Sequence, residues 1–195
     1  ISNLSDYFAG LANNSVDNPI KLNITGLTES NFSDFKTLLG SNTRKYVDLS
    51  MVTLPAIENL NQGLADCAGI VVAPQLSYGT KDISALFSRC NYLKTPPQSI
   101  PNSVTNMTST FWACFALQTC PDIPQNVEKM GTCFSNCTSL GSVTIGTTKV
   151  VQTEWVLAFN YCSDTIRVYV PNAAVKNTMI SANVGISGDN IYISP

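Results

Sequence analysis

The sequence predicts an α/β repeat fold in which units of ~23 residues stack on one another. Five segments share one pattern: a bulky apolar anchor, a cysteine three places later and usually an aliphatic residue three further on. These segments are Leu64-Cys67-Ile70, Phe87-Cys90-Leu93, Phe111-Cys114-Leu117, Phe134-Cys137-Leu140 and Phe159-Cys162, where the aliphatic residue slips by one to Ile166. The cysteines stand at positions 67, 90, 114, 137 and 162, so the pattern recurs at nearly equal intervals. That period is typical of a leucine-rich-repeat solenoid, built from short strands and short helical turns and capped at both ends.

A second register agrees with the first. The residues four places before the anchors are large and apolar, namely Leu60, Ile83, Met107, Met130 and Trp155. One unit of this size cannot bury its apolar side alone, so equivalent side chains of stacked units are expected to pack on each other. We therefore expect both registers in the core, with Trp155 among the core residues.

Each unit is expected to contain a short strand and a helical turn. Residues 142–145 and 167–170 alternate between polar and apolar side chains, as half-buried strands do. The stretch around each Phe-x-x-Cys fits one turn of helix, because residues three and four apart share a helix face.

The first 45 residues do not show the repeat. Their apolar spacing predicts helices over residues 3–11 and 30–39 and a strand over 20–24, and a further strand follows at 46–50. The open ends of a stack expose its core, so atypical terminal units are expected as caps. We expect a single domain over 1–195, with an N-terminal cap at 1–45, repeats at 46–170 and a C-terminal cap at 171–195.

Composition excludes several classes of function. The 195 residues have a net charge of −2, with no basic stripe for nucleic acid. There is no histidine, which excludes Ser-His-Asp and Cys-His catalysis and removes the commonest transition-metal ligand. No apolar run approaches the ~20 residues that span a bilayer. The chain opens with Ile1 and has no charged-then-apolar leader, so we expect a mature or trimmed chain whose targeting signal has been removed.

Seven cysteines are the most reactive side chains in the sequence. A disulfide or a metal site needs thiols that converge, whereas five of the seven occupy one slot of successive units, where small apolar side chains pack. Stacking could bring these cysteines within disulfide distance, although parallel Cβ directions would strain the bond. Cys133 and Cys137, at positions i and i+4, are the one pair that hints at a metal, but they lack histidine partners. We expect buried, reduced thiols and neither metal nor cofactor.

Three aromatic residues are candidates for binding a partner. Trp112 and Phe115 occupy slots in which the other Phe units carry serine, threonine or asparagine, and Tyr92 lies nearby in the preceding unit. Polar slots of a stack face solvent, so Trp112, Phe115 and Tyr92 predict an exposed contact patch. The alternative is that Trp112 and Phe115 fold over a local groove or under a neighbouring loop.

Other motifs carry little functional information. Asn-x-Ser/Thr triplets begin at Asn3, Asn13, Asn23, Asn31, Asn106 and Asn136. They would suggest glycans in a eukaryotic secreted protein, but in a chain rich in Asn, Ser and Thr they also arise by chance, which is the interpretation we favour. The acidic residues show no glycosidase or calcium-loop spacing, and there is no phosphate-binding glycine loop.

Several segments together resemble one known family. They are residues 104–107 leading to 111–114, residues 127–130 leading to 134–137, residues 158–162, and the flanking segments 42–50 and 168–171. On these the chain is similar to the BspA-type leucine-rich-repeat surface proteins of oral and gut bacteria. It departs from their pattern at Leu64, which replaces phenylalanine, and at the slipped Ile166. The resemblance implies a surface-exposed or lipid-anchored protein, with several members linked to adhesion, and it carries over no catalytic residue.

These observations predict a non-catalytic binding or adhesion module at the cell surface, either anchored to the outer membrane through an upstream lipid or secreted. The expected ligand is a protein or glycoprotein, from host matrix or from another bacterium, and we expect a monomer. The first alternative is a structural spacer or display domain of a surface lipoprotein. The second is an enzyme, which a deep cleft lined by acidic residues would indicate.

Overall fold

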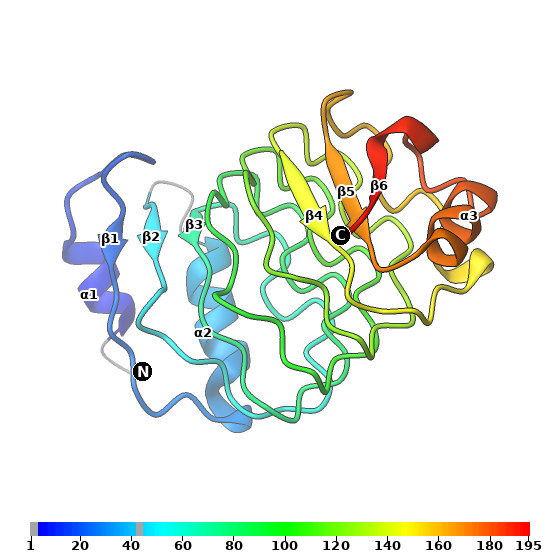
Figure 1. Cartoon of the computed structure of the whole chain (residues 1–195). Coiled ribbons are helices and arrows are strands. Elements are labelled where there is room, and N and C mark those ends of the chain that lie inside the picture. The colour runs from blue at the N-terminus through cyan, green and yellow to red at the C-terminus, as the bar shows by residue number, and fades with distance from the viewer. Residues whose placement is uncertain (1–3, 42–44) are drawn as a thin grey trace.

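The computed structural model describes residues 4–41 and 45–195 (Figure 1). Two parts of the sequence predictions lie outside the described residues: Asn3, which begins an Asn-x-Ser/Thr triplet, and residues 42–44 of the flanking segment 42–50. The helices are α1 (Leu4–Gly10), α2 (Glu29–Ser41) and α3 (Ala173–Ser181), with short 3-10 helices η1 (Gln152–Glu154) and η2 (Gly188–Asn190). The strands are β1 (Ile20–Lys21), β2 (Val47–Asp48), β3 (Ile70–Val72), β4 (Ser142–Thr144), β5 (Arg167–Val170) and β6 (Ile191–Ile193).

The strands form two separate parallel sheets, in the orders β1-β2-β3 and β4-β5-β6. In the second sheet Val143 pairs with Val168, which pairs in turn with Ile191. Figure 1 shows the first sheet near the N-terminal end of the molecule and the second near the C-terminal end, with the coils of residues 73–141 between them. The predicted strands at 142–145 and 167–170 therefore correspond to β4 and β5.

Backbone hydrogen bonds join each coil to the next, where a coil is the segment from one cysteine slot to the following one. Leu60 N donates to Asp82 O at 2.8 Å, and Met107 N donates to Lys129 O at 2.8 Å. In both bonds the carbonyl acceptor belongs to the neighbouring coil and directly precedes the residue equivalent to the donor. One sequence period is thus one full coil, after which the chain lies again on the same side of the stack.

Both predicted registers lie in the core, as expected. Leu64 and the four Phe anchors are fully buried, and so is Trp155. The rings of Phe87, Phe111, Phe134 and Phe159 form a continuous stack, with centroids 5.6, 5.5 and 5.4 Å apart and interplanar angles of 12°, 8° and 11°. Successive coils are held at a spacing that suits these parallel rings.

The predicted helical turn at each Phe-x-x-Cys is wrong. Within the described residues no helix covers any of these segments. In the coil that contains Phe87, Ile83 N and Ala85 N donate to the next coil, whereas Leu86 N donates to Ile83 O of its own coil. The N–H groups that an α-helix would donate four places back are therefore used between coils, and the segment forms consecutive β-turns.

Each of these turn segments contains two non-glycine residues in the left-handed region, which together form two ladders along the stack. The first ladder has φ between 52° and 56°, and the second has φ between 58° and 66°. The residues are Gln62, Ala85, Ser109, Thr132 and Leu157 in the first ladder and Asp66, Arg89, Ala113, Asn136 and Tyr161 in the second. A side chain in this region costs energy, so the stacking of coils must stabilise a strained backbone.

The predicted strand in every unit is also wrong, because the central coils contribute only isolated bridges such as Val72 to Thr95. Counting two places on from that bridge sets Pro74 opposite Pro97, and Pro121 occupies the same place in the following coil. Proline lacks the N–H that a strand donates to its neighbour. The Ile123–Ile145 bridge sets Pro121 opposite Val143 of β4, which is not a proline, and from β4 onward the sheet forms. The predicted α/β leucine-rich-repeat solenoid is therefore wrong. The fold consists of two short parallel sheets joined by turn-linked coils.

The terminal segments cover the two ends of the stack. Phe32, Phe35 and Leu39 of α2 are buried, and Lys36 Nζ donates to Gln62 O at 2.6 Å. At the other end, β6 adds to the sheet and α3 buries its own apolar residues. The predicted helix at 30–39 corresponds to α2, and the predicted strands at 20–24 and 46–50 are present as the shorter β1 and β2.

Shortening one ring of the phenylalanine stack tests how much the core depends on it. We expect Phe111→Ala to lower the free energy of unfolding by about 3–5 kcal/mol, because a fully buried ring leaves a cavity. Phe111→Leu should cost only about 1–1.5 kcal/mol, because the equivalent slot in the first coil already holds Leu64. Urea denaturation under reducing conditions measures both, and equal losses would contradict this account.

Two alanines of equal exposure test the left-handed strain. Ala113 has φ 58° and Ala65 is not in that region, while both are 7% exposed. Because glycine relieves strain at Ala113 alone, Ala113→Gly should leave the protein more stable than Ala65→Gly by about 1–2 kcal/mol. The measurement is the difference between the two unfolding free energies, and a difference near zero would mean that the backbone is unstrained.

Candidate functional site

The three predicted binding residues lie on the turn side of two neighbouring coils. Phe115 and Tyr92 are 44% and 42% exposed, and Trp112 is half-buried. Tyr92 packs edge-on against Tyr46, with ring centroids 5.1 Å apart and an interplanar angle of 89°. Phe115 makes no ring contact with Trp112 or Tyr92 among the described residues. The structure therefore exposes Phe115 and Tyr92 without joining all three rings into one cluster.

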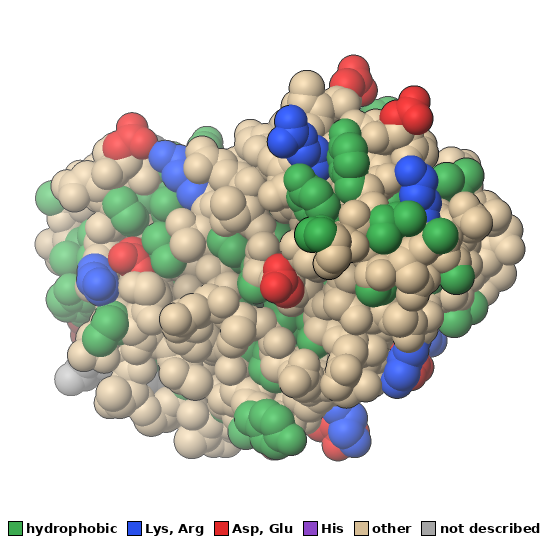
Figure 2. Space-filling model, viewed as in Figure 1, with side chains coloured by type: hydrophobic (Ala, Val, Ile, Leu, Met, Phe, Trp, Pro, Cys, Tyr) green, Lys and Arg blue, Asp and Glu red, His purple; other side chains and the backbone are tan. Residues whose placement is uncertain are grey.

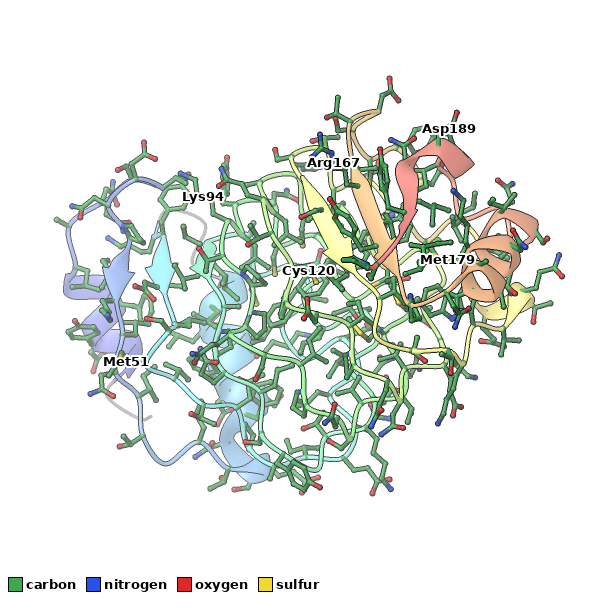
Figure 3. All side chains as sticks on the ribbon, viewed as in Figure 1. Met51, Lys94, Cys120, Arg167, Met179 and Asp189 are labelled. Atoms are coloured by element: carbon green, nitrogen blue, oxygen red, sulfur yellow. The ribbon has the colours of Figure 1, made fainter. Side chains whose placement is uncertain are left out.

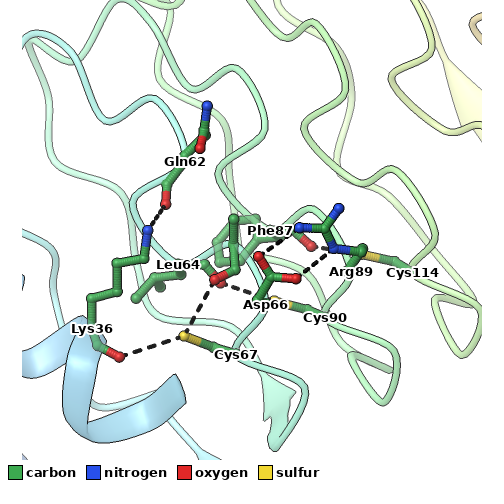
Figure 4. Close-up of polar contacts among 10 residues, drawn as sticks. Lys36, Gln62, Leu64, Asp66, Cys67, Phe87, Arg89, Cys90 and Cys114 are labelled. Carbon is green, nitrogen blue, oxygen red and sulfur yellow. Dashed lines mark hydrogen bonds and ion pairs between the residues drawn. The ribbon is translucent and has the colours of Figure 1, made fainter. Parts of the chain in front are cut away.

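Charged residues connect Trp112 to the preceding coils. The Arg89 guanidinium lies 5.6 Å from the centroid of the Trp112 ring. Its Nη2 donates to Asp66 Oδ2 at 2.7 Å, and its Nε donates to Asp66 Oδ1, so the pair is bidentate (Figure 4). Asp66 in turn lines a cavity of about 70 Å³ together with Tyr46 and Tyr92. We call Tyr46, Asp66, Arg89, Tyr92, Trp112 and Phe115 the aromatic edge.

The charges of the aromatic edge stabilise each other. The hydrogen bond from Arg89 lowers the pKa of Asp66 below its usual value, and the same bond raises the pKa of Arg89. Both side chains remain about half exposed, so the pair holds the guanidinium in place over Trp112 without removing it from water. The edge thus combines exposed apolar rings with a cation positioned over Trp112, which suits a contact surface.

The cysteine slot is a second chemical feature of the stack. All seven cysteines are free thiols. The thiol of Cys114 donates to Phe87 O at 3.1 Å, that of Cys137 to Phe111 O at 3.0 Å, and that of Cys162 to Phe134 O at 3.1 Å. The same bond joins Cys90 to Leu64 O at 3.3 Å, as Figure 4 shows. Each of these thiols therefore bonds to the anchor carbonyl of the preceding coil, as expected for buried reduced cysteines.

Burial makes these thiols poor nucleophiles. It raises the pKa of Cys67 and of Cys162 to about 12, and it raises the pKa values of the other five well above the usual range. A thiolate is the reactive form, so these cysteines remain protonated at neutral pH. Among residues 4–41 and 45–195 no group of three or more acidic or cysteine side chains is placed to hold a metal ion.

A second exposed apolar group was not found from the sequence. The rings of Tyr169 and Tyr192 on β5 and β6 lie 5.7 Å apart, and Ile193 is 51% exposed. Figure 2 shows hydrophobic side chains gathered over this sheet, with charged side chains scattered around them. Arg167, labelled in Figure 3, begins β5 beside this group. The spacing of the two tyrosines, one repeat period apart, is the signal that could have revealed it.

The sequence also missed Arg89 and Asp66 as parts of the aromatic edge. Both follow an anchor by two places and carry opposite charges, so the register alone places them side by side. Lys81 and Glu58 are also one repeat period apart, and Lys81 Nζ lies 3.0 Å from Glu58 Oε1. Lys94, labelled in Figure 3, pairs instead with Asp17 of the N-terminal segment at 2.8 Å, a contact that the register does not predict.

Comparisons with known proteins show a likeness of fold. No family model matches the chain, and no curated protein matches it. The crystal structure of the pneumococcal vaccine antigen PcpA is similar, with a TM-score of 0.50 and 15% sequence identity. The match covers 78% of this chain and 44% of the PcpA chain, so this chain spans less than half of that structure. No helix in the described part of the chain is long and apolar enough to cross a membrane.

The raised pKa values predict that alkaline pH destabilises the protein. In the unfolded chain each thiol ionises near pH ~8.5, whereas burial in the folded chain raises its pKa, to about 12 for Cys67 and Cys162. The folded state therefore binds more protons between these values, and stability falls as pH rises, by about 1.4 kcal/mol per pH unit for each buried thiol. Urea unfolding with reductant from pH 7 to ~10.5 measures this fall.

A cysteine variant isolates the contribution of one thiol. Cys114→Ala should show a pH slope that is shallower by about 1.4 kcal/mol per pH unit, whatever its stability at pH 7. Lysine and tyrosine titration affects both proteins alike and cancels in the comparison. Identical slopes for the two proteins would show that the Cys114 thiol ionises as readily in the folded chain as in the unfolded one.

Proposed function

We propose that this chain is a non-catalytic binding module of a bacterial protein that is displayed at the cell surface or secreted. The aromatic edge carries the proposal, because Phe115 and Tyr92 expose apolar rings on the turn side of the stack, where Trp112 and the Arg89 guanidinium above it also lie. Aromatic and arginine side chains are the residues that dominate protein contacts. The ligand that fits is a protein or glycoprotein.

Rigidity of the edge supports the same function. Arg89 N donates to Trp112 O at 2.8 Å, and Asp66 N donates to Ser88 O at 2.9 Å, so the backbone of the edge is held from coil to coil. A surface fixed before binding loses little backbone entropy when a partner docks. The protonated state of the buried thiols and the absence of histidine support a role without catalysis.

The surface location rests on two resemblances. The sequence resembles the BspA-type surface proteins in the segments around Phe111, Phe134 and Phe159. The fold is similar to that of a protein described as a pneumococcal vaccine antigen. We propose on these grounds that the parent protein is exposed to the surroundings of the bacterium.

A structural spacer is the second candidate. Coil-to-coil ion pairs, such as Lys81 with Glu58 and Lys149 with Glu128 at 3.3 Å, use charged side chains within the stack and leave few for a partner. A spacer needs a stiff body and no contact site. The two functions therefore differ in whether the aromatic edge captures anything.

A pull-down with host extracellular-matrix and salivary proteins tests the proposal. The chain should capture a partner that the Trp112→Ala, Phe115→Ala double variant loses by at least about tenfold, since contact aromatics contribute most of the binding energy. Tyr78→Ala is the matched control, because Tyr78 is an 84% exposed aromatic that does not belong to the edge. Thermal melting confirms that each variant is folded.

Two results would count against the binding module. Capture that is unchanged in the double variant would remove the aromatic edge as the site. No capture by the wild-type chain would favour the spacer.

A further inference from the structure

A polar groove lies at the C-terminal end of the stack, away from the aromatic edge. Its volume is about 780 Å³, and its lining residues come from the last coil and from the segment that connects α3 to β6. Figure 1 shows these two segments near the C-terminal end of the molecule. Most of its lining residues are polar or carry a hydroxyl: Asn160, Tyr161, Asp164, Asn183, Ser187 and Asn190.

The groove exists because the C-terminal segment leaves the register of the stack. Leu157 N donates to Asn183 O at 3.0 Å and Phe159 N to Val184 O at 2.8 Å, as if residues 183–184 began another coil. Gly185 then turns the chain with φ 90° and packs so closely that an added Cβ would lie 2.7 Å from Asn160 Cα. Beyond this glycine the chain no longer follows the last coil.

The break leaves one backbone donor without its partner. In the four preceding coils the equivalent N–H, for example that of Ala113 or Asn136, donates to a carbonyl of the next coil at 2.8 or 2.9 Å. Tyr161 N makes no hydrogen bond within the described residues. The equivalent N–H groups of the preceding coils all point toward the next coil. The Tyr161 N–H therefore points out of the last coil into the groove, where a ligand oxygen could accept a hydrogen bond from it.

Side chains in the groove are also free to bind. The side chains of Asn160, Asp164 and Asn183 make no hydrogen bond within residues 4–41 and 45–195, so their amides and carboxylate offer both donors and acceptors. Tyr161 is 70% exposed and presents its ring at the groove. Asn190 differs, because its Nδ2 donates to Asp164 O and to Ile166 O at 2.9 Å each, which fixes that wall.

We propose that this groove binds a neutral saccharide of about two or three sugar units, a size that suits a pocket of this volume. Sugar hydroxyls both donate and accept hydrogen bonds, as the free amides, the Asp164 carboxylate and the Tyr161 N–H require. The apolar face of a sugar ring packs on an exposed aromatic ring such as Tyr161. No lysine or arginine lines the groove, so an anionic ligand would meet only the like charge of Asp164.

Ligand titrations followed by amide NMR test the proposal. The probes are lactose, maltotriose, cellotriose, mannobiose and N,N′-diacetylchitobiose, each added to about 10 mM, with trialanine as a peptide probe. At least one saccharide should shift the amide resonance of Tyr161 and slow its hydrogen exchange, because that N–H gains an acceptor. Trialanine should leave it unchanged.

Three variants locate the site. Tyr161→Ala should weaken binding at least about tenfold, and Asn183→Gly should do the same. Glycine suits Asn183 because its φ of 51° lies in the left-handed region, so this variant removes the amide without straining the turn. Tyr78→Ala should bind as the wild type does. The proposal is overturned if no saccharide binds, if trialanine shifts the Tyr161 amide equally, or if both groove variants retain wild-type affinity.

Discussion

The structure depends on one constraint: every coil must present its backbone N–H groups to the carbonyls of the next coil. This ladder sets the coil length, and it aligns side chains that lie one repeat period apart in sequence. The phenylalanine rings stack because the ladder brings them to parallel positions 5.4 to 5.6 Å apart. The ion pair of Arg89 with Asp66 follows from the same alignment, so a property of the backbone determines what the surface displays.

The cysteine slot shows which side chains fit between coils that are joined by this ladder. An anchor carbonyl such as Phe87 O accepts from Cys90 N within its coil and from Cys114 Sγ of the next coil. Cysteine is small enough to pack there, and its thiol is a weak donor whose burial costs less than that of a hydroxyl. Each coil also needs two residues in the left-handed region. They direct alternate backbone N–H groups toward the neighbouring coil, and they strain the backbone locally.

The core could be predicted from the sequence, but the local conformation could not. Buried apolar residues three apart occur both in a helix and in consecutive β-turns, so Phe-x-x-Cys could not distinguish them. The prolines at 74, 97 and 121 indicate that strands are missing from the central coils, but only alignment of the coils reveals that they share one place. For the candidate site, Trp112 and Phe115 were predicted because they break a polar pattern, and Tyr92 because it lies nearby in the preceding unit. Tyr161 was missed because its groove depends on where Gly185 turns the chain.

The spacing of the coils also bears on how such a chain can change in evolution. A tandem duplication or deletion of one whole coil would preserve every register, since each coil contacts its neighbours in the same way. Length differences between the coils fall mainly in one part of the coil. Relative to the shortest unit, the longer coils gain length between Thr95 and Asn106 and between Ile145 and Trp155, opposite the turn segments. Lineages of this protein should therefore differ in coil number and in these loops, while the separation of anchor and cysteine stays constant.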